Sequence, residues 1–422
     1  MIKTIHTMNT GTRNIAIIIA LLFSGKAGGQ VLPLDSVLKL VDERNPMLQE
    51  FDNRVKAQQA YTAGAKGWMA PMIGAGTFMT PYPGQNPEEA SKGSMMISVE
   101  QNIPNPARLS ANERYYASRA AVEEQGRSRQ FNALRAEAKS TYYRWLAAEE
   151  KLTVLRSGDR IIEMMLKIAR IRYPYNQGSL GAIYKAEGRQ QEIQNMMLMT
   201  EGDIEESASR LRSLMNLPQN TPLMVDTTMN VRFTQGALAQ DTIALASQRS
   251  DVRQLEKTIE VMRLQQQLQQ YQAKPEFRVR FDHMQPIGAG MPTQFTAMAM
   301  VSIPIAPWAS KMYKSEVKGM SYDIEAMKRS KDAILVETRG MLAGMAAQLS
   351  RMERQLENYR LRIIPALEKN YQASRVAYEE NREQLPAVID AWEAMNMAQL
   401  EYTDKLNEYY QMIVRYEKEV ER

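Results

Sequence analysis

The chain has 422 residues, a formal net charge of +5 and no cysteine. The lack of cysteine excludes disulfides, zinc–thiolate sites and a cysteine nucleophile. Only two histidines are present, His6 and His283, which excludes a multi-histidine metal centre. The charge is too balanced to indicate nucleic acid as a partner, because the first thirty residues supply three of the positive charges.

The N-terminus has the pattern of a secretory signal peptide, which we expect to occupy residues 1–30. Lys3 and Arg13 precede the apolar run 15–23, and small residues follow the run. This run is too short to span a bilayer as a helix, and no later stretch reaches the roughly twenty apolar residues that a spanning helix needs. The pattern predicts export across one membrane and no transmembrane helix. A retained N-terminal anchor is the alternative interpretation.

Six segments have the composition of helices, because they are rich in Ala, Leu, Glu, Gln, Arg and Met. The predicted helices cover residues 35–66, 105–172, 182–216, 240–272, 309–377 and 385–420. We expect a break near Gly126 in the second. A seven-residue spacing, typical of a coiled coil, relates Leu134, Thr141, Ala148, Leu155 and Ile162. A helix over residues 131–172 would be ~60 Å long, which a compact globule does not need.

Four shorter segments alternate polar and apolar residues with the period of two that is typical of strands. They are residues 69–79, 93–103, 275–285 and 293–304. The first two segments are joined by a stretch rich in Pro and Gly, and so are the last two. We therefore expect two hairpins, each inserted between long helices.

The stretch EFRVRFDH, residues 276–283, indicates what surrounds this sheet. Its apolar face would carry Phe277, Val279 and Phe281. Its charged face would carry Arg278, Arg280 and Asp282. Segments of about ten residues have the length of a transmembrane strand, so we expect the apolar face to contact lipid and the charged face to line a watery lumen. Four strands cannot close a barrel in lipid, so two copies (eight strands) or three copies (twelve strands) are needed.

The chain repeats itself at an offset of about 204 residues. The stretch NPML (45–48) aligns with RSDV (249–252), and Tyr173 aligns with Tyr378. Each copy has a helix, a hairpin, a long helix, a break and a helix. We predict a duplicated half-molecule, with a first repeat at 31–217, a linker at 218–240 and a second repeat at 241–422.

The sequence resembles an outer-membrane efflux duct of the TolC family. The resemblance covers roughly residues 35–420 and rests on short motifs in a fixed order. These motifs are NPML (45–48), RSDVR (249–253), QNIP (101–104), VSIPIAPW (301–308) and the segments 169–180 and 374–385 beside the two helix breaks. Ser250 departs from the family, which often has proline there, and Glu383 and Gln384 replace a glycine-containing turn.

The resemblance implies a mostly α fold with a transmembrane β part. Four strands per chain would contribute to a twelve-stranded barrel of a homotrimer, above a long coiled-coil periplasmic tunnel with a gated tip. It also implies a passive outer-membrane channel of a tripartite efflux or type I export system, with a periplasmic adaptor and an inner-membrane pump as partners. We expect export of small toxic solutes, heavy-metal ions among the candidates.

Other function classes have less support. The sequence has no nucleotide-binding loop and no nucleophile motif, so we expect neither enzymatic activity nor a cofactor. A periplasmic coiled-coil adaptor or structural scaffold protein is the alternative function. An adaptor predicts no lipid-facing alternation, and the two hairpins argue against it.

Two groups of residues are candidates for function. The pore-lining candidates are Arg278, Arg280, Asp282, Met298 and Met300. The candidates for the gate at the periplasmic tip are Tyr173, Tyr175, Gly178, Ser179, Tyr378, Glu383 and Asp390. Three copies of Asp390 would form a ring around the axis, and a solvated helix face is the alternative for this residue. The expected partners of Asp390 are Lys185, Arg375 and Arg382.

Thirty methionines raise the question of metal transport. Thioethers suit Cu(I) and Ag(I), but methionine also replaces leucine in packing. We favour packing, expect no metal site, and keep Met298 and Met300 as weak candidates for ligands.

Overall fold

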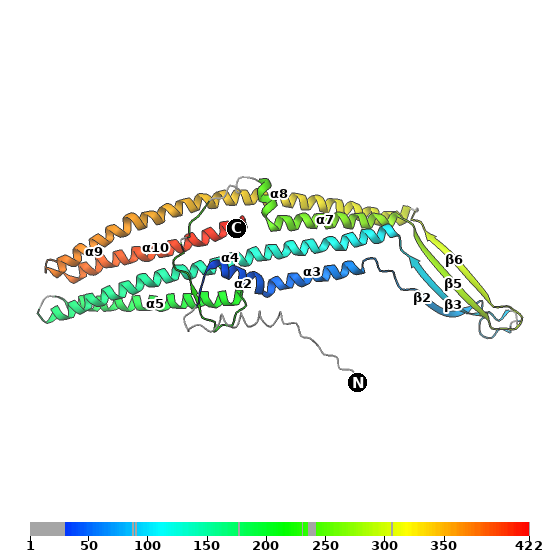
Figure 1. Cartoon of the computed structure of the whole chain (residues 1–422), viewed down its shortest axis with the longest axis horizontal. Helices are drawn as coiled ribbons and strands as arrows, with labels where there is room; N and C mark the ends of the chain where they lie inside the picture. Colours follow the sequence, from blue (N-terminus) through cyan, green and yellow to red (C-terminus); the bar gives the residue numbers. More distant parts are fainter. Residues whose placement is uncertain are drawn as a thin grey trace, which may run out of the picture.

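The computed structural model describes residues 30–86, 88, 91–175, 178–229, 231–234, 242–304 and 307–421. The signal peptide expected at 1–30 therefore lies outside the described residues, except for Gln30. The molecule is elongated, and four strands project from one end of a long array of helices (Figure 1). None of the helices described here is long and apolar enough to cross a membrane.

The first half of the chain contains the first hairpin and the longest helix. Its elements are β1 (Gln30–Leu32), α2 (Leu34–Arg44), α3 (Pro46–Gly64), β2 (Met72–Phe78), β3 (Ser94–Ile103), α4 (Pro106–Arg172), a 3₁₀ turn η2 (Tyr173–Tyr175), α5 (Leu180–Leu214) and β4 (Leu223–Val225). The single helix predicted at 35–66 is wrong, because Asn45 is extended before Pro46. The Asn45 side chain caps α3 by accepting a hydrogen bond from the Met47 N–H at 3.0 Å.

The second half repeats this order of elements. It contains α6 (Thr242–Gln248), α7 (Ser250–Gln270), η4 (Tyr271–Ala273), β5 (Glu276–Pro286), β6 (Gln294–Ser302), α8 (Pro307–Asn358), a π-helical segment η5 (Tyr359–Ile363), α9 (Ile364–Glu379) and α10 (Leu385–Glu419). Arg249 is extended between α6 and α7, as Asn45 is between α2 and α3. The helix predicted at 309–377 contains the π-helical segment just before Pro365, which has no N–H for the helix.

The break predicted near Gly126 is wrong, because α4 continues through this residue. Gly126 is buried, and a Cβ atom on it would lie 2.8 Å from Phe51 Cε1 and 3.0 Å from Gln254 Nε2. The glycine therefore allows α3 and α7 to approach α4 closely.

The four long strands form one antiparallel sheet in the order β2-β3-β5-β6. The register places Val99 opposite Phe281, and Phe281 opposite Ala297. The outer strands β2 and β6 each have one unpaired edge within this sheet. A second, parallel pair joins β1 to β4. These two strands cannot be predicted from the sequence, because three residues are too few for a periodic pattern.

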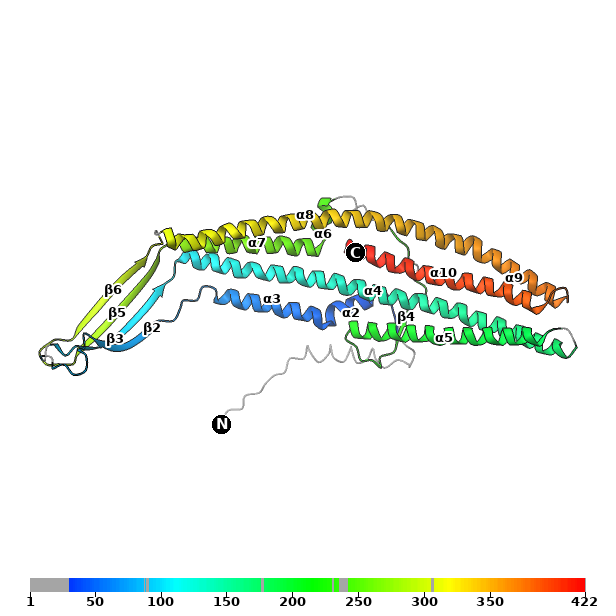
Figure 2. The same cartoon turned by 180° about the vertical axis from the view of Figure 1, so that it is seen from behind.

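The helices form a curved wall in which α4 is central. Near the strands α4 packs against α3 and α7, and farther away it packs against α5 and α10 (Figure 2). The seam predicted from the seven-residue spacing is buried, since Leu134, Thr141, Ala148, Leu155 and Ile162 are each at most 8% exposed. This seam is the reason that so long a helix is stable.

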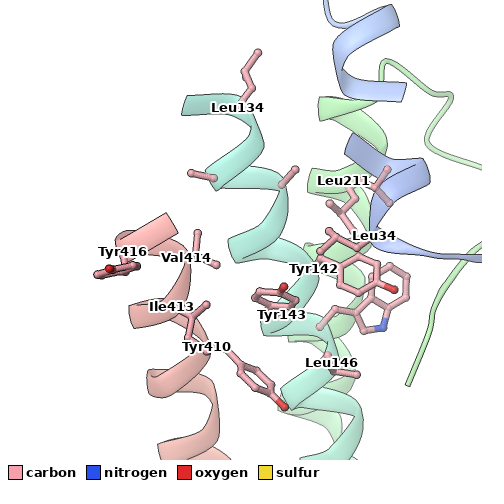
Figure 3. Close-up of a cluster of buried hydrophobic side chains, with 14 of the residues drawn as sticks. Leu34, Leu134, Tyr142, Tyr143, Leu146, Leu211, Tyr410, Ile413, Val414 and Tyr416 are labelled. Carbon is pink, nitrogen blue, oxygen red and sulfur yellow. The ribbon is translucent and has the colours of Figure 1, made fainter. Parts of the chain in front are cut away.

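The main core cluster lies where α4 and α10 meet (Figure 3). Tyr143 and Tyr410 pack with ring centroids 5.5 Å apart. The Tyr142 hydroxyl donates to the Leu32 carbonyl at 3.0 Å and accepts from the Asp226 N–H at 2.9 Å. Tyr142 thus connects α4 to the segments that contain β1 and β4.

Candidate channel wall and tip

One face of the four-stranded sheet is mostly apolar, with Gln101 and His283 among the polar residues on it. Because side chains alternate along each strand, residues in register share a face. One such row contains Ile73, Val99, Phe281 and Ala297. Ile73 is 75% exposed and Phe281 is 47% exposed, so this face has no cover within the described part of the chain. The rings of Phe281 and Phe295 stack at 5.8 Å on the same face.

The opposite face carries all five residues predicted to line the pore. Arg278 Nη1 lies 2.9 Å from Glu100 Oε1, and Arg278 Nε donates to Asn102 Oδ1 at 2.8 Å. Arg280 Nε donates to Asp282 Oδ1 at 2.8 Å. Each arginine therefore has a carboxylate beside it. Glu100 was not among the predicted pore residues, although its alternation with Val99 places it on this face.

Met298 and Met300 lie next to these arginines. In the register of β5 and β6, Met298 is opposite Arg280 and Met300 is opposite Arg278. A guanidinium group beside each thioether opposes the binding of a cation there. In the described part of the chain, no group of three or more His, Asp or Glu residues could hold a metal ion.

The end of the wall away from the strands contains two helical hairpins, α4 with α5 and α9 with α10 (Figure 1). In the first hairpin, Tyr173 and Tyr175 lie in the 3₁₀ turn, and Tyr175 is 74% exposed. Gly178 then leads to Ser179, whose hydroxyl accepts the Ala182 N–H at 3.2 Å and caps α5.

In the second hairpin, Tyr378 is buried in the last turn of α9 and contacts Arg172 of α4. Arg172 donates to the Tyr378 carbonyl at 2.7 Å and to the Glu379 carbonyl at 3.0 Å. Its guanidinium group also lies 4.7 Å from the centre of the Tyr378 ring. Burial raises the pKa of Tyr378, and the charge of Arg172 opposes the increase. Arg172 links the two hairpins, although no pattern in the sequence distinguishes it from other arginines.

The turn after α9 is well defined despite its lack of glycine. Asn381 has a φ of +58°, the left-handed conformation that glycine often adopts at a helix C-terminus. The Arg382 N–H donates to the Ala377 carbonyl at 2.8 Å and closes the turn. Glu383 is half-buried in the same turn, just before α10 begins.

Asp390 lies on α10 and pairs with Lys185 of α5. The distance from Lys185 Nζ to Asp390 Oδ1 is 2.5 Å, and 62% of the Asp390 side chain is exposed. The other two expected partners of Asp390 pair elsewhere, Arg375 with Glu379 at 3.7 Å and Arg382 with Glu380 at 3.2 Å. The carboxylate of Asp390 is therefore accompanied by one cation from the other repeat.

Comparisons with solved structures identify this arrangement. The Vibrio cholerae outer membrane protein VceC is 11% identical, over 92% of this chain and 95% of its own, with a TM-score of 0.71. The Neisseria gonorrhoeae MtrE outer membrane channel, in its open state, is 13% identical over 92% and 88%, with a TM-score of 0.72. The chain has the fold of these outer-membrane proteins.

The Campylobacter jejuni CmeC outer membrane channel gives the same result, with 12% identity over 92% of this chain and 85% of its own and a TM-score of 0.72. No protein-family model matches the sequence, and a comparison with curated proteins gives no match. The likeness to these channels is a likeness of fold. It confirms, for the fold, the resemblance to the TolC family that the sequence indicated.

Proposed function

We propose that the chain is a passive exit duct in an outer membrane, part of a tripartite efflux or type I export system. It moves small toxic solutes from the periplasm to the exterior. Its energy comes from an inner-membrane pump, to which a periplasmic adaptor connects it. The likeness to outer-membrane channels supports this function. The proposal rests mainly on the two faces of the four-stranded sheet. One face is mostly apolar and exposed, and the other is charged.

Lipid is the environment that suits this sheet. An exposed apolar face across four strands is unfavourable in water and favourable in a bilayer. An arginine on the lipid face would cost about 2–4 kcal/mol near the midplane, so Arg278 and Arg280 keep the register fixed with the charged face in a lumen. The unpaired edges of β2 and β6 cannot remain open in lipid. A homotrimer closes them into a twelve-stranded barrel.

The two helical hairpins form the periplasmic gate in this proposal. They lie at the end opposite the strands, so a barrel in the outer membrane directs them into the periplasm (Figure 1). The repeats at 31–217 and 241–422 each supply one hairpin, and 218–240 links them. The gate residues are Tyr173, Tyr175, Gly178, Ser179, Tyr378, Glu383 and Asp390. A bound adaptor opens the gate by favouring one of two arrangements of the tips.

Two measurements test the duct. Purified protein in a planar bilayer is expected to give discrete channels, and no conductance at any voltage contradicts the proposal. The cysteine-free chain also allows clean labelling of single cysteines in outer-membrane vesicles. A charged thiol reagent is expected to label Arg280→Cys and to spare Phe281→Cys. The reverse result would show that the lumen faces the other side of the sheet.

Recovery of the mature chain in a soluble periplasmic fraction would support a scaffold or adaptor instead. The narrower idea of metal export is tested by replacing Met298 and Met300 with leucine. If these thioethers carry Cu(I) or Ag(I), tolerance to those ions falls while the trimer remains. Unchanged tolerance leaves packing as their role.

A further inference from the structure

A stripe of three lysines lies at the start of α8, where the sheet joins the helical wall (Figure 1). Lys311, Lys314 and Lys318 are exposed, and none of them forms an ion pair within the described part of the chain. They are spaced by three and four residues, so they are neighbours on the helix surface and repel one another. An anionic partner would relieve this repulsion.

The three lysines share one side of α8. The helix packs against α7 through a seam that contains the buried Ser310 and Ile324, and Gln266 of α7 donates to Ser321 Oγ at 2.7 Å. At 100° per residue, the lysines lie about 40–100° around the helix from Ser310 in one direction. The two acidic residues of 307–323 lie about 120–140° away in the other direction. One side of α8 is therefore purely basic beside the sheet.

An exposed tryptophan lies next to this basic side. Trp308 is 80% exposed and lies about 160° from Ser310 in the direction of the lysines. Trp68, just before β2 at the same end of the sheet, is 58% exposed. Tryptophan is enriched where a membrane meets water, because its ring is apolar and its N–H is polar. The basic side of α8 is thus the side suited to the bilayer surface.

The lysines are also close enough to the end of the sheet to reach headgroups. Lys311 lies ~6 Å along the axis from the start of α8, and Lys318 lies ~16 Å along it. Helical side chains tilt toward the N-terminus, which for α8 is the end beside the sheet. Lysine stems are long and can extend toward an interface. The headgroup layer is ~5–8 Å thick on each side of a bilayer, so Lys311 and Lys314 reach it most easily.

We propose that Lys311, Lys314 and Lys318 bind the phosphate groups of anionic phospholipids, of the phosphatidylglycerol class, in the periplasmic leaflet. This inference rests on the proposed function, which places the sheet in a bilayer. The lysine stripe continues the mostly apolar lipid-facing surface of the sheet, and its charge is complementary to the lipid. Trp308 anchors the same level of the protein in the headgroup layer. The duct would then prefer anionic lipids around its periplasmic end.

The tryptophans of the full-length chain can report on this contact. Of the four, Trp145 and Trp392 are only 5% and 2% exposed, so a quencher in the lipid reaches mainly Trp68 and Trp308. In Trp68→Phe, Trp308 remains as the exposed tryptophan. We reconstitute this chain in phosphatidylcholine vesicles that contain phosphatidylglycerol or phosphatidylcholine brominated close to the headgroup, at equal mole fractions. Quenching is expected to be stronger with the brominated phosphatidylglycerol, and the difference should shrink at high salt.

The test variant replaces the three lysines of the stripe by glutamine in the same background. Each lysine close to an anionic surface contributes about fivefold to binding, so the preference for phosphatidylglycerol should fall by roughly tenfold or more. The matched control replaces Lys39, Lys167 and Lys369, three exposed lysines far from the sheet, and should keep the preference. Equal preferences in the two variants overturn the inference.

Conductance in planar bilayers separates this inference from the proposed function. An unmodified chain that conducts but shows no preference for phosphatidylglycerol retains the duct and overturns the inference. A chain that neither inserts nor conducts contradicts both. If an excess of inorganic phosphate at constant ionic strength abolishes the preference, the lysines bind free phosphate and the inference is wrong. Cross-linking of Lys314→Cys to another protein in cells, with no lipid preference in vesicles, assigns the stripe to an acidic protein and also overturns it.

Discussion

Lys185 and Asp390 form an ion pair of 2.5 Å although 205 residues separate them in the chain. The alignment of the two repeats places them at equivalent positions, each just after a tip turn. One turn farther along, Arg189 Nε lies 2.6 Å from Glu393 Oε1. Two ion pairs between the repeats, of which only Lys185 and Asp390 occupy equivalent positions, thus connect α5 to α10 near the tip.

Removing the cation of this pair is expected to change ion selectivity. In Lys185→Gln, each Asp390 carboxylate loses its counter-charge, so we expect a stronger cation preference of the open channel. Asp390→Asn is expected to weaken that preference. An exposed pair contributes only about 0–1 kcal/mol, so trimer stability changes little. The reversal potential of single channels in a salt gradient measures the effect.

The control for this experiment is Lys39→Gln, which removes an exposed lysine far from the tip. Its reversal potential is expected to match that of the unmodified channel. If Lys185→Gln and Asp390→Asn also match it, the pair lies on the outer surface of the tip and not beside the ion path.

Replacing Arg172 is expected to loosen the tip. Arg172→Ala removes two hydrogen bonds to carbonyl groups of α9 and the contact with the Tyr378 ring. Hydrogen bonds of charged groups contribute about 1.5–3 kcal/mol when they are shielded from water, and less here because Arg172 is only half-buried. We expect a higher open probability in planar bilayers. Arg170→Ala, which removes an exposed pair with Glu187, is the control and should leave the open probability unchanged.

The sequence contained most of the architecture, because periodicity is a local signal. The four strands, the alternation in 276–283 and the buried seam of α4 all follow from spacings of two or seven residues. The breaks at Asn45 and Arg249 were missed as helix ends, although the repeat alignment starts at these positions. Because good helix formers flank the single extended residue on both sides, the composition of the segment does not reveal such a break.

The contacts of the site could not be predicted in the same way. Gly126 allows close packing against Phe51 of another helix. From the sequence alone, a glycine that allows close packing cannot be told apart from a glycine that breaks a helix. Arg172 acts on backbone carbonyls 206 and 207 residues away, and any residue can supply a carbonyl. Asn381 takes the left-handed conformation in the second tip turn, whereas the sequence comparison with the family drew attention to Glu383 and Gln384.

Gly126→Ala is expected to destabilise the folded chain. The new methyl group would lie 2.8 Å from the Phe51 ring, so α3 must shift or the ring must leave its position. Overpacking of this kind costs about 1–3 kcal/mol. Gly64→Ala is the control, because a Cβ atom there meets nothing within 4 Å. Thermal unfolding followed by circular dichroism should show a lower midpoint for Gly126→Ala alone, and equal midpoints would contradict the packing argument.

The stability of the joint between α7 and α10 is expected to depend on pH through Asp251. Arg249 donates to both carboxylate oxygens of Asp251, at 3.0 and 2.7 Å, and to Glu419 at 2.7 Å. Burial would raise the pKa of Asp251, but the hydrogen bonds and charge of Arg249 outweigh it, and the net shift is downward from 3.8. A lowered pKa in the folded state stabilises the chain above the unfolded value of 3.8, and this stabilisation is lost as the pH falls through the folded value.

Asp251→Asn should therefore reduce the free energy of unfolding at pH 6 by about 1–3 kcal/mol, because a charged hydrogen-bonded pair is lost. The difference from the unmodified chain should shrink below the ordinary carboxyl pKa of 3.8, where Asp251 of the unfolded chain begins to be protonated. Unfolding midpoints of the two chains at pH 6 and at pH 3 measure this convergence. Asp332→Asn, at an exposed site, should change neither midpoint. A difference that stays constant between the two pH values would show that Asp251 acts through packing and not through its charge.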